Sequence, residues 1–314
     1  MARPIRIEYP GAFYHITARG NEGKEIFKST QDRRTFLSCL ESTIQRYQAV
    51  IHVYCLMNNH YHLLLETPAG NLSQILQHIN GTYTRNFNAK RKRWGHLFQG
   101  RYKAILVDAD AYAAELSRYI HLNPVRAGLT RRPEEYPWSS YHYYTGQRKK
   151  PNWLTVDLIL GYFSGKPSSS RKDYRDFVFA LVDREYESPL RDTMASTILG
   201  SKDFVHTIKE RYVAGRKPDR NLPALTELSK FSTLDILNAA RKEWGEDHPL
   251  TRKAALYLCH RYSGRTLKEI GSHFSIGESA VSQASRRFQL TLDEDPKLRK
   301  KIQGLCRKLR LSNE

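Results

Sequence analysis

Met-Asn-Asn-His-Tyr-His-Leu-Leu-Leu-Glu, residues 57–66, combines an Asn-Asn turn with a strand that follows it. Side chains alternate between the two faces of a strand, so His60 and His62 share one face while Tyr61 and Leu63 share the other. One face can therefore be packed while the other carries two imidazoles, which is half of a metal site. Histidines spaced in this way are also common as partly exposed or hydrogen-bonded strand residues, and the pair alone leaves both interpretations open.

The sequence around this strand predicts an α+β domain with an antiparallel sheet and helices on one side. Apolar alternation and helical periodicity give the order β-α-β-β-α-β, which is that of a ferredoxin-like fold. The expected strands are residues 13–18, 50–57, 60–66 and 102–107, and the expected helices are residues 32–47 and a segment that opens at residue 71.

A further helix is predicted in residues 111–123, which are rich in Ala and Leu. Asp110 can cap its start, and Pro124 is expected to stop it near Asn123. Tyr119 and Asn123 are four residues apart on one helical face, so a tyrosine nucleophile and an oxygen ligand would reach the same point.

Four motifs in this order resemble those of a known family: Tyr-His-Ile-Thr-Ala-Arg-Gly-Asn at 14–21, His-Tyr-His at 60–62, Gln-Gly-Arg-Tyr-Lys at 99–103, and residues 119–128. They are similar to the single-tyrosine HUH transposases, and among these to the REP-associated tyrosine transposases, which are relatives of the IS200-like transposases. The resemblance implies the same ferredoxin-like fold. It also implies cleavage of hairpin-bearing single-stranded DNA, with a 5′-phosphotyrosine and a free 3′-hydroxyl as products.

The resemblance selects Tyr119 as the nucleophile over Tyr112, which shares the same helical face. His60 and His62 would bind a divalent metal, Mg²⁺ or Mn²⁺, that polarises the phosphate. Asn123 is the expected third ligand because hard cations accept amide oxygens, although it could equally cap the turn before Pro124. Glu115, one turn before Tyr119, is the alternative oxygen ligand.

The length and net charge of the chain limit the number of its domains and the class of its partners. The 314 residues allow two or three domains, and a formal charge of +19 makes a polyanion the expected partner. We expect an HUH nuclease domain at 1–147, a helical linker region at 148–214 and a helical DNA-binding domain at 215–314. An apolar run long enough to span a membrane and a signal peptide are both lacking, so the cytoplasm is the expected location. The four cysteines are expected to be reduced and mostly packed, and the sequence does not decide between monomer and homodimer.

Basic residues cluster in residues 85–103, which hold seven Lys or Arg and no acid, with aromatic residues such as Trp94 between them. Cations that neutralise phosphates and rings that stack on bases suit single-stranded DNA. A solvated loop with aromatic anchors, or surface ion pairs, would give the same pattern. The DNA-binding candidates in this half of the chain are Arg19, Lys90, Arg91, Lys92, Arg93, Arg101 and Lys103.

Residues 266–288 predict two helices joined by a turn at 275–277, with Gly271 where they would cross. The pattern resembles the helix-turn-helix of the bacterial replication initiator DnaA, although a helix pair that serves only as a bundle fits as well. Its outward candidates for duplex DNA are Ser282, Gln283, Arg286 and Arg287. Residues 297–310 follow as an amphipathic basic helix. The middle of the chain predicts helices at 174–186 and 203–212 and a break at 216–223.

The function expected from these features is that of a metal-dependent single-strand DNA endonuclease and strand-transferase. Two other classes remain open: a sequence-specific DNA-binding regulator with an inactive nuclease centre, and an RNA nuclease that acts through a metal-bound water. A protein-linked product distinguishes the first from both alternatives.

Overall fold

The computed structural model describes residues 6–163, 167–184, 186–213, 233–263 and 265–309. The described residues divide into two compact units, one within residues 6–206 and the other within residues 207–309. The predicted break at 216–223 lies outside the described residues. Each unit is taken by itself below.

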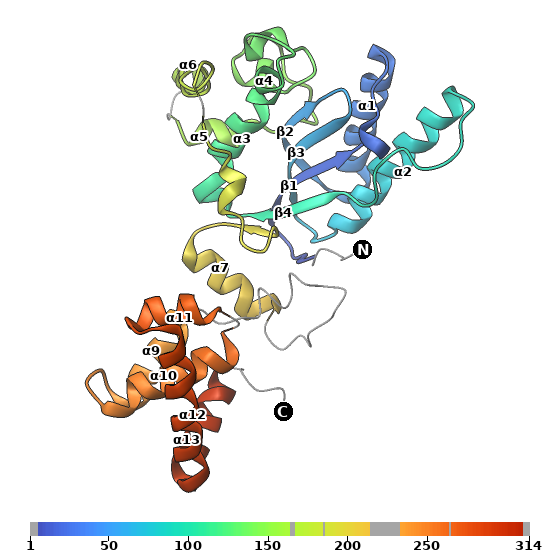
Figure 1. Ribbon diagram of the computed structural model, residues 1–314. Helices are drawn as coiled ribbons and strands as arrows, with labels where there is room; N and C mark the ends of the chain where they lie inside the picture. The colour runs from blue at the N-terminus through green and yellow to red at the C-terminus, as the bar shows by residue number, and fades with distance from the viewer. Residues whose placement is uncertain (1–5, 164–166, 185, 214–232, 264, 310–314) are drawn as a thin grey trace. The chain divides into compact units, whose positions relative to one another are not determined.

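The first unit is built on a five-stranded sheet in the order β2-β3-β1-β4-β5 (Figure 1). Its strands are β1 (Ala12–Arg19), β2 (Val50–Leu56), β3 (His60–Thr67), β4 (Lys103–Val107) and β5 (Ile198–Leu199). The two helices between the first four strands are α1 (Thr30–Tyr47) and α2 (Leu72–Lys90). Neighbouring strands are antiparallel except β4 and β5, which are parallel. The predicted α+β class and β-α-β-β-α-β order are confirmed.

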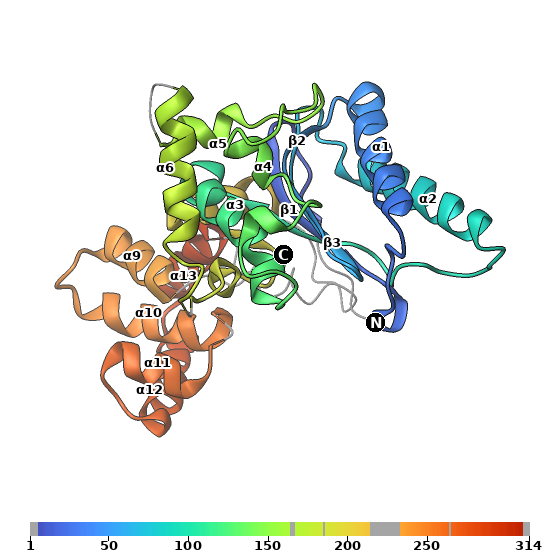
Figure 2. The ribbon, with the colours of Figure 1, turned by 90° about the horizontal axis from the view of Figure 1, so that it is seen from above.

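As the alternation of β3 predicted, one face of the sheet is packed against helices with apolar and aromatic side chains, and the other carries the two imidazoles. Figures 1 and 2 show α1 and α2 on one side of the sheet and α3 (Ala109–Arg126) on the other. On the α1 side, the Tyr61 ring packs 4.7 Å from the Phe36 ring, centroid to centroid. On the α3 side, His62 lies beside Tyr119. The register pairs Thr17 of β1 with His62, so these side chains share the α3 face.

Helix α3 corrects the prediction that Pro124 ends it near Asn123. The helix begins at Ala109 and runs through Pro124 to Arg126. A proline inside a helix removes one hydrogen-bond donor, and here the last turn still closes because the N–H of Ala127 donates to the carbonyl oxygen of Asn123 at 2.9 Å. Asn123 therefore lies within the helix and does not cap a following turn.

The segment after α3 belongs, as far as residue 206, to the same compact unit as the sheet. Its helices are α4 (Tyr141–Tyr144), α5 (Asp157–Gly161), α6 (Pro167–Phe179) and α7 (Lys202–Ile208). Tyr174 of α6 is fully buried, and its hydroxyl lies 2.6 Å from His121 Nδ1 and 3.0 Å from Ser117 Oγ, both on α3. The predicted boundary at residue 147 thus does not separate compact units.

One local prediction in this segment is wrong, because the helix expected at 174–186 instead starts at Pro167 and ends at Phe179. The helix expected at 203–212 is present as α7, Lys202–Ile208, followed by a π-helical segment, Lys209–Val213. The strand β5, which pairs with β4, was not predicted.

The second unit is helical where the structure describes it. Its helices are α9 (Thr233–Trp244), α10 (Pro249–Tyr262), α11 (Leu267–Phe274), α12 (Glu278–Glu294) and α13 (Pro296–Lys308). A shared core includes Ile236 of α9, Leu258 of α10, Val281 of α12 and Ile302 of α13. The predicted helix pair and the amphipathic character of α13 are therefore confirmed.

The turn between α11 and α12 explains the glycine at the helix crossing. A Cβ atom on Gly271 would lie 2.5 Å from the carbonyl oxygen of Ile276, which no side chain can tolerate. Ser275 takes the left-handed conformation, with φ of 54°, and caps α11.

All four cysteines are free and buried, as predicted. Within the described residues, helices of the length and apolarity needed to cross a bilayer are absent.

Candidate active site

The strand β3 and the helix α3 bring His60, His62 and Tyr119 together on the α3 face of the sheet. The rings of His60 and His62 lie 5.0 Å apart, centroid to centroid, at 77°. The Tyr119 ring meets His62 edge-on at 6.0 Å. For Tyr112, the alternative nucleophile, the structure has no such ring contact among the described residues. The geometry therefore favours Tyr119, which is half-buried and reaches the histidines.

A third histidine, which the sequence reasoning did not select, completes this cluster. His15 of β1 lies with its ring stacked on His62 at 5.3 Å and edge-on to Tyr119 at 6.1 Å. Its Nε2 atom is 3.0 Å from His62 Nδ1. The sequence shows only that His15 and Thr17 share one strand face, whereas the pairing of Thr17 with His62, which brings His15 to the site, is a register of the folded sheet.

The environment keeps the three imidazoles in the neutral form that a metal ligand requires. Burial lowers the pKa of His15 to about 3, and the charge of Lys103 adds to that effect. Burial, and then Arg19, lower the pKa of His60. Burial also lowers the pKa of His62 well below its ordinary value, with His15 and His60 contributing.

The donor atoms of the two predicted ligands fit a cation. His62 Nε2 is buried and has no hydrogen-bond partner in the structure. His60 Nδ1 lies 2.7 Å from Asn59 Oδ1, so Nε2 is the ring nitrogen of His60 that is left to bind a cation. Two neutral imidazoles with an unengaged nitrogen are typical of a divalent transition-metal site.

The contacts of Glu115 and Asn123 bear on which of them would be the third metal ligand. Across the described residues, no three His, Cys, Asp or Glu side chains are grouped to hold a metal ion. Glu115, the alternative ligand, instead forms an ion pair with Arg118. Asn123 donates its Nδ2 to the carbonyl oxygen of Tyr119 at 2.8 Å.

Cationic side chains flank the histidines. Arg19 pairs in register with His60, and Lys103 pairs with Thr17, the neighbour of His62, so both lie on the α3 face. Both are exposed, as is Arg101 just before β4. Arg126 of α3, which the sequence reasoning did not single out, lies 5.4 Å from the Tyr119 ring centroid.

The basic segment after α2 contains two kinds of cation. Lys90 Nζ lies 3.0 Å from Asp32 Oδ1, and Arg91 forms an ion pair with the other carboxylate oxygen of Asp32. The Asp32 side chain is only 3% exposed, so Lys90 and Arg91 of the predicted DNA-binding set are already paired with a buried carboxylate. Lys92 and Arg93 have no carboxylate partner within the described residues, although Arg93 donates to the carbonyl oxygen of His96.

Trp94 at the tip of this segment is 94% exposed. The segment then returns to the site, because Gln99 N donates to the carbonyl oxygen of Arg19 at 2.8 Å. The basic loop therefore ends beside the strand position that pairs with His60.

In the second unit, Gln283, Arg286 and Arg287 of α12 are exposed and Ser282 is half-buried. They are the predicted contacts of the helix pair with DNA.

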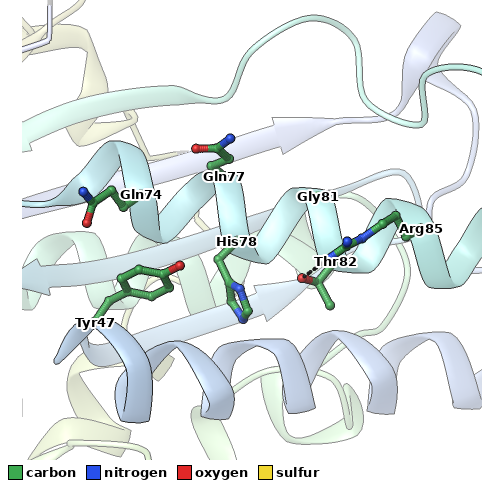
Figure 3. Close-up of a pocket in the computed structure, with 7 residues that line it drawn as sticks. All are labelled: Tyr47, Gln74, Gln77, His78, Gly81, Thr82 and Arg85. Carbon is green, nitrogen blue, oxygen red and sulfur yellow. Dashed lines mark hydrogen bonds between the residues drawn. The ribbon is translucent and has the colours of Figure 1, made fainter.

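A cavity of about 580 Å³ lies between α1 and α2, on the sheet face opposite the histidines (Figure 3). Its lining includes Tyr47, Gln74, His78 and Arg85. His78 Nε2 is held 2.9 Å from Ser42 Oγ. The cavity contains none of the residues of the histidine and tyrosine cluster, so it is separate from that site.

Comparisons with known proteins give a family model, a curated relative and a solved structure that are similar to parts of this chain. The family model described as "Transposase IS200 like" matches residues 9–123. A Haemophilus influenzae protein named among the REP-associated tyrosine transposases is 26% identical over 118 residues, which are 34% of this chain and 67% of that protein. A solved structure described as a REP-associated tyrosine transposase bound to a REP hairpin is 16% identical with a TM-score of 0.42, covering 50% of this chain and 93% of that one.

The matched range spans β1 to β4 and ends at Asn123, so it contains His15, His60, His62 and Tyr119. The transposase motifs and the cluster on the α3 face thus lie within one domain. Residues 9–123 are therefore similar to the transposase domain described by the IS200-like family model, and part of the chain is similar to a REP-associated tyrosine transposase.

Proposed function

We propose that this chain is a metal-dependent single-strand DNA endonuclease and strand-transferase that forms a 5′-phosphotyrosine on Tyr119. The observation that carries the proposal is the placement of Tyr119 edge-on to His62, whose Nε2 atom is buried without a partner. A nucleophile and an unengaged metal-ligating nitrogen at one point are what phosphodiester cleavage by a tyrosine requires.

The reaction exchanges the ester bond between phosphorus and the 3′ oxygen for an ester bond between phosphorus and the tyrosine oxygen. A phosphodiester repels nucleophiles by its negative charge, and a Mg²⁺ or Mn²⁺ ion held by His60, His62 and Asn123 would polarise its oxygens. The Tyr119 oxygen attacks phosphorus and gives up its phenolic proton to solvent, while the bond to the 3′ oxygen breaks and that oxygen takes up a proton from solvent. Because the new ester keeps the bond energy, a later 3′-hydroxyl can reverse the attack and join a different strand.

Cations of this chain would hold the strand in place. Arg19 and Lys103 share the sheet face of the histidines, and Lys92, Arg93 and the exposed Trp94 lie on the loop that returns to β1. Cations and an exposed ring suit a single strand, since phosphates and base faces are both available there. The solved relative is described as bound to a REP hairpin, and we propose a hairpin-bearing single strand as the substrate here.

The second unit would contribute duplex binding through the exposed face of α12. Gln283, Arg286 and Arg287 are exposed on the helix that follows the Ser275 turn, as in a helix-turn-helix reader. The cytoplasm, where such DNA is found, is the proposed place of action.

The test uses two tyrosines on one helix. Purified protein is incubated with a labelled hairpin oligonucleotide and Mn²⁺, and covalent adducts are resolved on denaturing gels. Tyr119→Phe should abolish the adduct while DNA binding stays near that of the unmodified chain, because it deletes one hydroxyl. Tyr112→Phe is the matched control and should leave the adduct intact.

Three outcomes would contradict the proposal. An adduct that persists in Tyr119→Phe moves the nucleophile elsewhere. Cleavage without any protein-linked product indicates a water-using nuclease acting on DNA or RNA. Binding without cleavage by the unmodified chain indicates a DNA-binding regulator.

A further inference from the structure

A neutral imidazole has one ring nitrogen that carries a proton and one that carries a lone pair, and only the lone pair binds a metal. The partner of the first nitrogen decides which is which. In both His60 and His62, the Nδ1 atom has a partner and the Nε2 atom is the one left over. The partners of Nδ1 therefore bear on whether the site can bind a cation at all.

On His60 the partner is an oxygen of known orientation. Asn59 donates its Nδ2 to the carbonyl oxygen of Gly23 at 3.0 Å, which fixes the amide so that Oδ1 faces His60. His60 Nδ1 lies 2.7 Å from that oxygen, so Nδ1 must carry the proton. The lone pair of His60 is then on Nε2.

On His62 the partner is another imidazole, and the proton can sit on either side. If His15 Nε2 carried it, His62 would have its own proton on Nε2, a buried N–H without an acceptor, and could not bind a metal. If His62 Nδ1 donates to His15, the unpartnered Nε2 is a lone pair directed at the site. The stacked His15 ring, only 2% exposed, has the position of that acceptor.

We propose that Asn59 and His15 are positioning residues that hold His60 and His62 as Nδ1–H tautomers, so that both Nε2 atoms present lone pairs to the cation. Partners of this kind usually fix the ring orientation of metal-bound histidines and make them more basic. The inference rests on the proposed metal-dependent function and adds two residues to it.

The first experiment needs no variant. Long-range ¹H–¹⁵N correlation spectra of the metal-free chain, kept in chelator, report the tautomer of each histidine directly. We expect Nδ1–H for both His60 and His62. An Nε2–H form of either ring in the unmodified chain would overturn the proposal.

The second experiment measures Mn²⁺ affinity by calorimetry. His15→Phe keeps a stacked ring but removes the acceptor and should weaken Mn²⁺ binding by about 10- to 100-fold. His15→Gln restores an acceptor and should recover part of the loss. His52→Phe is the matched control, because His52 is also 2% exposed and lies on the same sheet face, paired with Glu66; its Mn²⁺ affinity should not change.

The neighbouring asparagines supply the same comparison for His60. Asn59→Leu should weaken Mn²⁺ binding to a similar degree, whereas Asn58→Leu should not, since the Asn58 side chain accepts from Arg33 at 2.7 Å instead. Equal affinity in the unmodified chain, His15→Phe and Asn59→Leu would refute the positioning role alone. Absence of Mn²⁺ binding by the unmodified chain would instead refute the proposed function.

Discussion

The pairing of Asp32 with Lys90 and Arg91 predicts that the basic segment binds DNA through its other cations. Burial alone would raise the pKa of the Asp32 carboxyl, but hydrogen bonds from Arg91 and Lys90 outweigh burial and hold that pKa below its usual value. The carboxylate is therefore charged at neutral pH and already neutralises its neighbours. Lys92 and Arg93 lack such a partner among the described residues, so we expect them to contact phosphates.

The size of the effect follows from how many phosphates the two side chains neutralise. On a single strand, each phosphate that is no longer neutralised lowers the slope of log affinity against log salt by about 0.7. Replacing both Lys92 and Arg93 with alanine should therefore reduce the slope by about 1.4. Between 50 and 200 mM salt, the unmodified chain would then lose about sevenfold more affinity than the double variant. Lys90→Ala should change the slope by less than about 0.7, because its ammonium is already paired with Asp32.

The assay is fluorescence anisotropy of a labelled hairpin with a single-stranded flank, across a salt series. All chains carry Tyr119→Phe and are kept in chelator, so that neither cleavage nor metal binding alters the signal. A slope for the Lys92 and Arg93 double variant equal to that of its parent would refute the argument. So would a Lys90→Ala variant whose slope falls as far as that of the double variant.

Two further predictions concern the first unit. A chain ending at Val213 should fold and bind Mn²⁺. A chain ending at Gly146 should be largely unfolded by circular dichroism, because it lacks the buried Tyr174 and the strand β5. A native spectrum of the shorter chain would contradict this. Burial, with a contribution from His142, lowers the pKa of His121 from 6.5 to about 3, so between these two pH values His121 is mostly protonated in the unfolded chain and mostly neutral in the folded chain. As the pH is lowered, the free energy of unfolding should therefore fall more steeply in the unmodified chain than in His121→Gln, by up to about 1.4 kcal/mol per pH unit. Urea denaturation between pH 6 and 4 measures both free energies, and parallel pH profiles for the two chains would contradict the prediction.

Much of the sheet could be predicted because its first four strands are signalled locally. Alternation in β3 and helical periodicity in α1 each depend on residues within a few positions of one another. The strand β5 was missed because it has only two residues, Ile198 and Leu199, and exists by pairing with β4 far along the chain. A pairing of this kind leaves no periodic pattern. The end of α3 was mispredicted because Pro124 was taken to stop a helix whose last turn closes without its N–H.

The site residues also fall into those that the sequence could predict and those that it could not. His60, His62 and Tyr119 could be chosen from spacing and family motifs, but the part played by His15 depends on the register between β1 and β3. The engagement of Lys90 was likewise beyond local reasoning, since its partner Asp32 is on α1. A run of cations looks the same in sequence whether or not a distant carboxylate neutralises part of it.

The alternation of β3 also limits how this enzyme can evolve. A single residue inserted into the turn at Asn58 and Asn59, with strand pairing kept, would exchange the two faces of β3. Tyr61 would then face Tyr119, and both imidazoles would enter the apolar layer beneath α1. Such a change removes the reaction and the core in one step, with no intermediate of partial function. Diversification among descendants of this chain is therefore expected in the basic loop and the second unit, where length can vary without turning a strand over.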